Sequence, residues 1–315
     1  MRTVLVTGGA GFIGSHLVDA LVRRGERVRV LDNFSTGDPA NLDEVAGQVD
    51  VIEGDLTDFD TVQRATKGVE VVFHQAALAS VPRSVANPLA THRACVDGTL
   101  HVLLAARDAG VRRVVYAASS SAYGNSARLP KTETDPTAPL SPYAVAKLAG
   151  EQYCAAFSEV YGLETVRLRY FNVYGPRQTP DSPYAAVIPL FIQAIREGRS
   201  PRVHGDGQQS RDFTYVADVV QANLKAAEAP GVSGRVYNVA GGQRVSLLNL
   251  LHLLSQLMET EVRPEFVASR PGDVKHSQAD IQRAMDDLGY RPTTDLRTGL
   301  RACIQWAEQR TPAVV

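Results

Sequence analysis

The chain has 315 residues, 44% of them hydrophobic, and a formal net charge of -1 at pH 7. This composition is ordinary for a globular protein with one large or two modest domains. The balanced, interleaved charge excludes a general basic surface for nucleic acid, and no stretch reaches the roughly 20 apolar residues of a membrane span. Three widely spaced cysteines suit reduced thiols. We therefore expect a soluble, cytoplasmic protein that binds neither nucleic acid nor membrane.

A glycine-rich turn joins the first predicted strand, at 4–7, to the first helix. Gly8, Gly11 and Gly14 are spaced by three residues, and Gly14 also closes a G-x-G-x-x-G pattern. Glycines let the backbone turn tightly and approach a pyrophosphate. The helix that begins near Phe12 directs its free N–H groups at the same place. The turn is typical of a dinucleotide site, although such a pattern alone is a weak signal.

An acidic residue follows the second predicted strand, at 28–31. Asp32 lies close to the spacing at which a carboxylate accepts hydrogen bonds from the adenosine ribose. Its charge repels a 2′-phosphate and no arginine directly follows, which indicates NAD rather than NADP. The alternative is a turn residue ahead of Asn33 and Gly37.

Strands and helical patterns alternate over the first 116 residues. Strands are predicted at 4–7, 28–31, 49–53, 69–74 and 111–116, and helices at 14–24, 59–66 and 91–109. This order indicates β-α-β units on a parallel sheet. Asp55 and Leu56 follow the third strand, where adenine would lie, and Gln75, Ala76 and Ala77 follow the fourth, where small residues let a flat cofactor pass. Ordinary strand-end chemistry is the alternative for both groups.

The pattern becomes less regular beyond residue 165. Further elements are predicted as a strand at 165–170, helices at 186–198, 216–229, 247–258, 280–287 and 296–309, and a strand at 235–239. We expect an α/β fold with a doubly wound Rossmann domain over residues 1–170, to which part of 212–240 returns. A smaller mixed α/β domain over 171–315 would supply loops to the cleft.

A tyrosine and a lysine share one face of the helix predicted to end near Tyr161. Tyr143 and Lys147 are four residues apart. The lysine charge, with that of an oxidised nicotinamide, favours the phenolate and lowers the tyrosine pKa from about 10. Ser119 and Ser120 end the fifth strand, where a hydroxyl relays the proton or holds the substrate oxygen. For the tyrosine and lysine taken alone, a surface pair is the alternative.

Together these motifs resemble the extended short-chain dehydrogenase/reductases, and within them the nucleotide-sugar 4-epimerases, over nearly the whole chain. The matching blocks are 7–14, 32–33, 54–56, 74–77, 141–143 with Lys147, 169–175, 210–213 and 270–274. The resemblance implies that Tyr143 is the base and that Lys147 holds the nicotinamide ribose. Ser119 would be the serine partner, with Ser120 beside it and the register open by one residue.

The resemblance also implies two sets of contacts, and no residue is assigned to a metal. The NAD contacts are Gly8, Gly11, Phe12, Ile13, Gly14, Asp32, Asn33, Asp55, Leu56, Gln75, Ala76, Ala77, Tyr143, Lys147 and Tyr170. The UDP-sugar contacts are Ser80, Arg83, Ser119, Asn172, Ala186, Val187, Arg211, Arg270, Asp273 and Ser277. Arginines suit a pyrophosphate as charged forks, although each arginine alone could be a solvated surface residue.

The predicted helix at 91–109 carries one departure from the family. Cys95 stands where an asparagine is usual, which puts one contact behind the cofactor in doubt. The same helix and the one at 145–161 resemble the pair that forms a four-helix dimer interface in the family. The resemblance therefore implies a homodimer.

The absence of an acidic residue ahead of Tyr123 separates epimerisation from dehydration and decarboxylation. The resembling dehydratases and decarboxylases place an acidic residue ahead of a Tyr-Gly pair, whereas Ser120, Ser121 and Ala122 precede Tyr123 here. We therefore predict a 4-epimerase whose NAD is catalytic and stays bound. An NAD(P)-dependent reductase is one alternative. A protein that keeps the fold only to sense NAD is another, but it would be expected to lose the tyrosine or the lysine.

The residue type at position 277 predicts the substrate. In resembling epimerases that act only on UDP-glucose and UDP-galactose, a tyrosine stands four residues after the motif's aspartate, here Asp273, against the C2 side of the sugar. Ser277 leaves room for an N-acetyl group, although it could merely cap the helix near Asp280. We predict interconversion of UDP-N-acetylglucosamine and UDP-N-acetylgalactosamine, with weaker action on UDP-glucose and UDP-galactose. UDP-glucose and UDP-glucuronate 4-epimerases are the alternatives.

Overall fold

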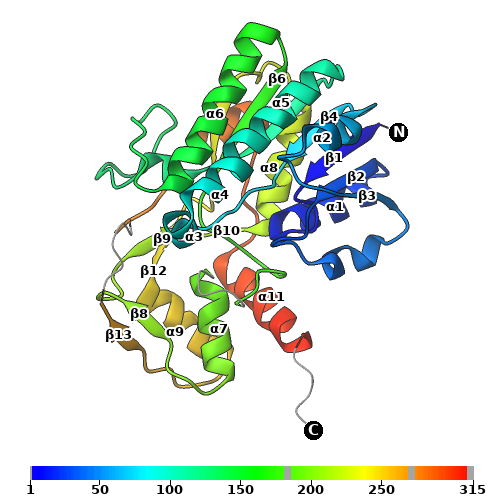
Figure 1. The fold of residues 1–315 in the computed structure, drawn as a ribbon. Coiled ribbons are helices and arrows are strands. Elements are labelled where there is room, and N and C mark those ends of the chain that lie inside the picture. The colour runs from blue at the N-terminus through cyan, green and yellow to red at the C-terminus, as the bar shows by residue number, and fades with distance from the viewer. Residues whose placement is uncertain (1, 181–185, 269–273, 311–315) are drawn as a thin grey trace.

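A seven-stranded parallel sheet forms the centre of the computed structural model, which describes residues 2–180, 186–268 and 274–310. The strands are β1 (Thr3–Thr7), β2 (Arg27–Asp32), β3 (Val49–Glu53), β4 (Val71–His74), β5 (Arg113–Ser119), β6 (Glu164–Tyr170) and β11 (Arg235–Val239). Their order is β11-β6-β5-β4-β1-β2-β3, and every neighbouring pair is parallel (Figure 1). The order reverses beside β1, which confirms the predicted doubly wound Rossmann-type fold.

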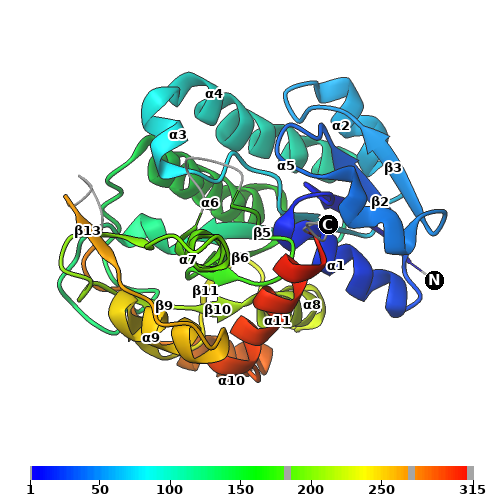
Figure 2. The same cartoon turned by 90° about the horizontal axis from the view of Figure 1, so that it is seen from below.

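Helices cover both faces of this sheet. One face packs against α1 (Phe12–Arg23), α8 (Val216–Glu228) and α10 (Gln282–Leu288), and the other against α2 (Phe59–Thr66), α5 (Gly98–Asp108) and α6 (Pro142–Tyr161). Figure 2 shows α5 and α6 on one side of the strands and α8 and α10 on the other. Because successive side chains of a strand point to opposite faces, Val4 and Val6 join the first core and Leu5 the second.

A second unit lies past the carboxyl ends of the strands, at the lower end of Figure 1. Its helices are α7 (Val187–Arg196), α9 (Leu247–Leu257) and α11 (Leu296–Gln309), which share a third apolar core. Its short strands are β7 (Val173–Tyr174), β8 (Arg202–His204), β9 (Ser210–Asp212), β10 (Thr214–Tyr215), β12 (Arg244–Ser246) and β13 (Glu265–Val267). They form three two-stranded sheets, β10-β7, β12-β9 and β13-β8.

Residues 216–239 and 282–288 lie with the first unit, although they are late in the sequence. β11 pairs with β6 at the edge of the large sheet, and α8 and α10 contribute to the core shared with α1. None of the helices in the described ranges is long and apolar enough to cross a membrane.

Several short elements differ from the sequence prediction. The expected helix at 91–109 is three segments: α4 (Pro88–His92), a π-helical turn η2 (Arg93–Asp97) and α5. The helix α3 (Val81–Ala86) and the 3₁₀ segments η1 (Pro39–Val45) and η3 (Ser120–Tyr123) were not predicted. Elements of four to seven residues contain too few turns for a hydrophobic period to be recognised.

Candidate active site

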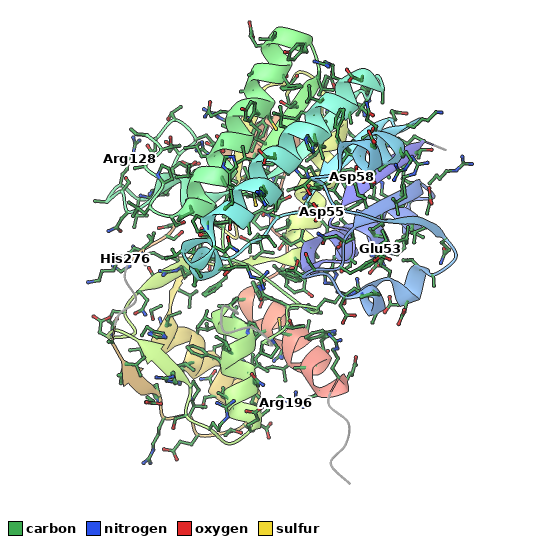
Figure 3. The ribbon with its side chains drawn as sticks, viewed as in Figure 1. Glu53, Asp55, Asp58, Arg128, Arg196 and His276 are labelled. Atoms are coloured by element: carbon green, nitrogen blue, oxygen red, sulfur yellow. The ribbon has the colours of Figure 1, made fainter. Side chains whose placement is uncertain are left out.

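A cavity of about 1000 Å³ follows the carboxyl ends of the strands, between the large sheet and the second unit. Asp55 and His276, both labelled in Figure 3, line widely separated parts of it. Ligands of open α/β sheets bind in this crevice. A cavity of this size is at the upper end of the range for ligand-binding pockets.

Most of the predicted contact residues line this cavity. They are Gly8, Gly11, Phe12, Ile13, Gly14, Asp32, Asn33, Asp55, Leu56, Gln75, Ala76, Ala77, Ser80, Arg83, Ser119, Ser120, Tyr143, Tyr170, Asn172, Ala186, Arg211 and Ser277. Lys147 and Val187 are not among the lining residues. Val187 instead packs against the third core, and Lys147 is buried behind the cavity. Arg270 and Asp273 lie outside the described residues.

The glycine turn after β1 leaves the backbone accessible at the start of α1. A Cβ on Gly14 would lie 2.0 Å from the Gly8 carbonyl oxygen, so no side chain fits there. Gly8 has φ +68°, and a Cβ on it would lie 2.7 Å from the Ala76 Cα. No side chain caps the helix, whose first N–H groups stay available to an anion. The turn therefore fits a dinucleotide pyrophosphate.

Asp32 is held in a fixed orientation at the end of β2. Its Oδ2 accepts the Ala10 N–H at 2.9 Å, and its Oδ1 accepts the Phe34 N–H at 2.9 Å. An ionised carboxylate has about four acceptor positions, so both oxygens can still accept ribose hydroxyls. Nearby, Asn33 Nδ2 donates to Asp55 Oδ2 at 2.6 Å, which joins the second and third strand ends.

Ser119 is the serine that meets the tyrosine. Its hydroxyl is hydrogen-bonded to Tyr143 and lies 2.8 Å from Ser121 Oγ. Ser120 begins the 3₁₀ segment η3, one residue past the end of β5. The structure therefore brings Ser119 next to Tyr143, and Ser120 lines the cavity beside it.

The pKa of Tyr143 is raised in the protein without cofactor. Burial raises this pKa to about 12, with Cys95 adding to the increase and the Ser119 hydrogen bond opposing it. Lys147 is also buried, which lowers its own pKa, and its Nζ lies 4.7 Å from the ring centroid of Tyr116. The predicted decrease requires the charge of oxidised nicotinamide beside Lys147, so it stays a prediction for the NAD-bound enzyme.

His74 is a neutral, fully hydrogen-bonded residue behind the site. Burial, with a smaller contribution from Lys147, lowers its pKa to about 3. Thr99 Oγ1 donates to the Cys95 carbonyl at 2.6 Å and therefore accepts from His74 Nε2 at 3.0 Å. His74 Nδ1 then accepts from Thr7 Oγ1 at 2.7 Å. This chain joins β1 and β4 to the π-helical turn that carries Cys95, so the histidine supports the site without exchanging protons near neutral pH.

Strand β9 organises the substrate side of the cavity. Ser277 N–H donates to the Ser210 carbonyl at 3.0 Å, and Ser210 Oγ lies 2.9 Å from His276 Nδ1. Asn172, with φ +30°, donates through Nδ2 to the Asp212 carbonyl at 3.1 Å. These bonds place Asn172, Ser277 and the β9 residue Arg211 around one region of the cavity.

Asp212 and several cavity residues were missed by sequence reasoning. Asp212 Oδ2 accepts the Ala279 N–H at 3.1 Å, and burial raises the pKa of this carboxyl to about 7. Asp212 is not itself a lining residue, whereas Asp38, Lys131, Arg177 and Arg310 line the cavity. Only Asp212 could have been found from the sequence, because it lies in the block 210–213 that resembles the family. The other four depend on packing between distant segments.

Among residues 2–180, 186–268 and 274–310, no group of three or more His, Cys, Asp or Glu side chains is arranged to hold a metal ion. The donors that line the cavity are instead backbone amides, hydroxyls, carboxylates and guanidinium groups, the set that recognises nucleotides.

Comparison with known proteins agrees with this geometry. Residues 4–240 match the NAD dependent epimerase/dehydratase family. A putative UDP-glucose 4-epimerase of Methanocaldococcus jannaschii is 39% identical over 96% of this chain and 97% of its own. A similar solved structure is that of UDP-N-acetylglucosamine 4-epimerase from Methanobrevibacter ruminantium in complex with UDP-N-acetylmuramic acid. Its TM-score is 0.94 at 42% identity, and the match covers 98% of this chain and 99% of that chain.

A third similar protein is UDP-glucuronic acid 4-epimerase from Bacillus cereus, whose structure is in complex with UDP-glucuronic acid and NAD. Its TM-score is 0.92 at 32% identity, and the match covers 98% of this chain and 99% of that chain. The chain belongs to the NAD-dependent epimerase/dehydratase family of extended short-chain dehydrogenase/reductases. Within that family it is a nucleotide-sugar 4-epimerase, and its cofactor is NAD.

Proposed function

We propose that this epimerase interconverts UDP-N-acetylglucosamine and UDP-N-acetylgalactosamine, with weaker action on UDP-glucose and UDP-galactose. The observation that carries the proposal is Ser277, a small side chain that lines the cavity on a segment bonded to β9. A hydroxymethyl group there leaves the volume that an N-acetyl group needs, and its hydroxyl can bond the amide. A tyrosine at the same position would fill that volume.

Overall similarity to relatives does not identify the substrate. Proteins named for UDP-glucose, UDP-glucuronate and UDP-N-acetylglucosamine all match this chain over nearly its full length at 32–42% identity. Overall similarity therefore does not separate the substrates, and a local contact near the sugar is the better guide.

Each residue of the site has a proposed role. When bound, NAD supplies the oxidising chemistry, taking a hydrogen with its electron pair from C4 and returning it to the opposite face of the 4-keto sugar. Tyr143 accepts the proton of the C4 hydroxyl and gives it back to the same oxygen when the hydrogen returns to C4, and Ser119, hydrogen-bonded to Tyr143, orients that oxygen. Lys147 binds the nicotinamide ribose and favours the phenolate. Ser80, Arg83 and the other predicted sugar-nucleotide residues hold the UDP-sugar.

The diphosphate and uridine contacts complete the proposed site. Asn172 and Arg211 line the cavity, and a guanidinium suits a diphosphate. Arg270 and Asp273 keep the roles that the family resemblance implies, a second diphosphate contact and a ribose contact.

We also propose a homodimer through residues 91–109 and 145–161. The outer face of α6 exposes Val145, Tyr153, Val160 and Tyr161, which supports a covered surface there. Sedimentation velocity should give a dimer mass, and Val160→Glu should shift the protein toward monomer. A wild-type monomer at micromolar concentration would contradict the proposal.

The purified enzyme should act without added cofactor. An epimerase returns the hydrogen to the sugar, so NAD that stays bound is regenerated in each turnover. Incubation with UDP-N-acetylglucosamine, UDP-glucose or UDP-glucuronate and no added NAD, followed by chromatography, should give the fastest epimerisation for the acetylated sugar. Steady-state consumption of added NADH would instead indicate a reductase, and faster turnover of UDP-glucose would reject the substrate assignment.

A further inference from the structure

A short segment covers one rim of the cavity next to the glycine turn. It consists of Asp38 and the 3₁₀ helix η1, and we call it the rim segment. Asp38 N–H donates to the Ala10 carbonyl at 3.1 Å, and Asn41 Nδ2 donates to the same oxygen at 2.9 Å. Both residues line the cavity. The rim segment is therefore hydrogen-bonded to the glycine-rich turn, which fits the dinucleotide pyrophosphate.

Two arginines from distant parts of the chain reach this region. Arg310, directly after α11, donates through Nη2 to Asp38 Oδ2 at 2.8 Å, and its guanidinium lies 5.1 Å from the ring centroid of Trp306. Arg177 follows β7, and its Nη1 lies 2.8 Å from Asp19 Oδ2 on α1. Both arginines line the cavity.

The two ion pairs differ in burial. The Arg177 and Asp19 side chains are only 12% and 6% exposed, so this pair is shielded from solvent. Arg177 adopts φ +67°, and the carbonyl of the preceding Pro176 lies 3.0 Å from His16 Nε2 on α1. The Arg310 and Asp38 side chains are 43% and 39% exposed. One pair is thus a firm anchor on α1, and the other is a weaker contact that can open at the rim.

We propose that these two pairs, Asp38 with Arg310 and Asp19 with Arg177, form a clasp that retains NAD between turnovers. Each pair joins the dinucleotide half of the cavity, α1 or the rim segment, to a residue that follows an element of the second unit. Widening the cofactor end by moving the two units apart requires both pairs to break. Retention suits an epimerase because the reaction restores NAD and gains nothing from its release.

The rate of NAD release from the purified holoenzyme tests the clasp, measured as exchange of bound NAD for radiolabelled NAD. Arg310→Gln and Asp38→Asn should each accelerate release about 2- to 5-fold, the range for an exposed ion pair. Asparagine at 38 keeps the oxygen that accepts the Ala40 N–H, so the start of η1 is preserved. If the pair is the cause, the double variant should release NAD no faster than the faster single variant. Arg301→Gln, an exposed change on the same helix α11, is the matched control and should leave the rate unchanged.

The buried pair should have the larger effect. Arg177→Gln leaves the Asp19 carboxylate without its cation, and release should accelerate more than about 10-fold. Because this variant could fail to fold, the salt dependence of the wild type is the second measurement. Raising the salt to about 1 M screens the exposed pair, so release should accelerate in the wild type and less in Arg310→Gln. Equal release rates in the wild type, Arg310→Gln and Asp38→Asn, or equal acceleration in Arg301→Gln, would overturn the proposal.

Discussion

Tyr143→Phe should lower turnover by about 10²–10⁴-fold, the range for loss of a general base, with the fold and bound NAD intact. The substitution keeps the partly buried ring at the start of α6, where it lines the cavity, and removes only the hydroxyl, which is hydrogen-bonded to Ser119. Initial rates with UDP-N-acetylglucosamine, together with circular dichroism and bound NAD content, give the measurement. Tyr153→Phe, an exposed tyrosine on the same helix, is the matched control and should be fully active.

The pH profile separates a base from a packing residue. Burial raises the pKa of Tyr143 to about 12, so in the protein alone the phenol is protonated at neutral pH. A base acts in its ionised form, and activity should therefore rise with pH until the tyrosine of the NAD-bound enzyme is ionised. The residual activity of Tyr143→Phe should lack this rise. Full activity in the variant would reject the mechanism.

Ser277→Tyr should cut activity on UDP-N-acetylglucosamine by about 10- to 100-fold and spare UDP-glucose. Filling an occupied pocket costs on the order of 1–3 kcal/mol, which is about that range of rate. The backbone of residue 277 is fixed by its bond to the Ser210 carbonyl, so a larger side chain cannot move away with the chain. The ratio of kcat/KM for the two sugars is the measurement.

A second substitution tests space against hydrogen bonding at this position. Ser277→Ala keeps the volume and removes the hydroxyl, so it should retain most activity on the acetylated sugar. If the tyrosine variant loses both activities equally, residue 277 does not face the C2 side of the sugar. If the wild type does not act on acetylated sugars, the substrate assignment fails whatever the variants do.

The parallel sheet could be predicted from the sequence because its signals are local. The strand at 49–53 and the helix at 59–66 have the predicted bounds. The helix at 142–161 begins where Ser141 caps it, with its Oγ accepting the Ala144 N–H at 3.2 Å. Short segments such as η1 and α3 were not predicted, because their conformation depends on a few capping and tertiary contacts rather than on a repeating apolar pattern.

Part of the candidate site could be predicted for the same reason. Gly8, Asp32 and Ser119 occupy strand ends, and the carboxyl ends of parallel strands meet along one crevice, so sequence position alone brings them together. Lys147 could not be placed beyond its helical face. The packing of α6 buries it beside Tyr116, where its own pKa falls and the pKa of Tyr143 is raised by burial.

The dinucleotide turn, the polar residues at successive strand ends and the family could all be predicted from the sequence, because each depends on residues within one or two elements. Two contacts could be found only in the folded protein: Ser119 lies next to Tyr143, and Arg310 contacts Asp38, 272 residues away. Local motifs follow from backbone geometry and spacing over a few residues. Contacts between distant segments depend on how complete cores pack, and no short stretch of the chain encodes that arrangement.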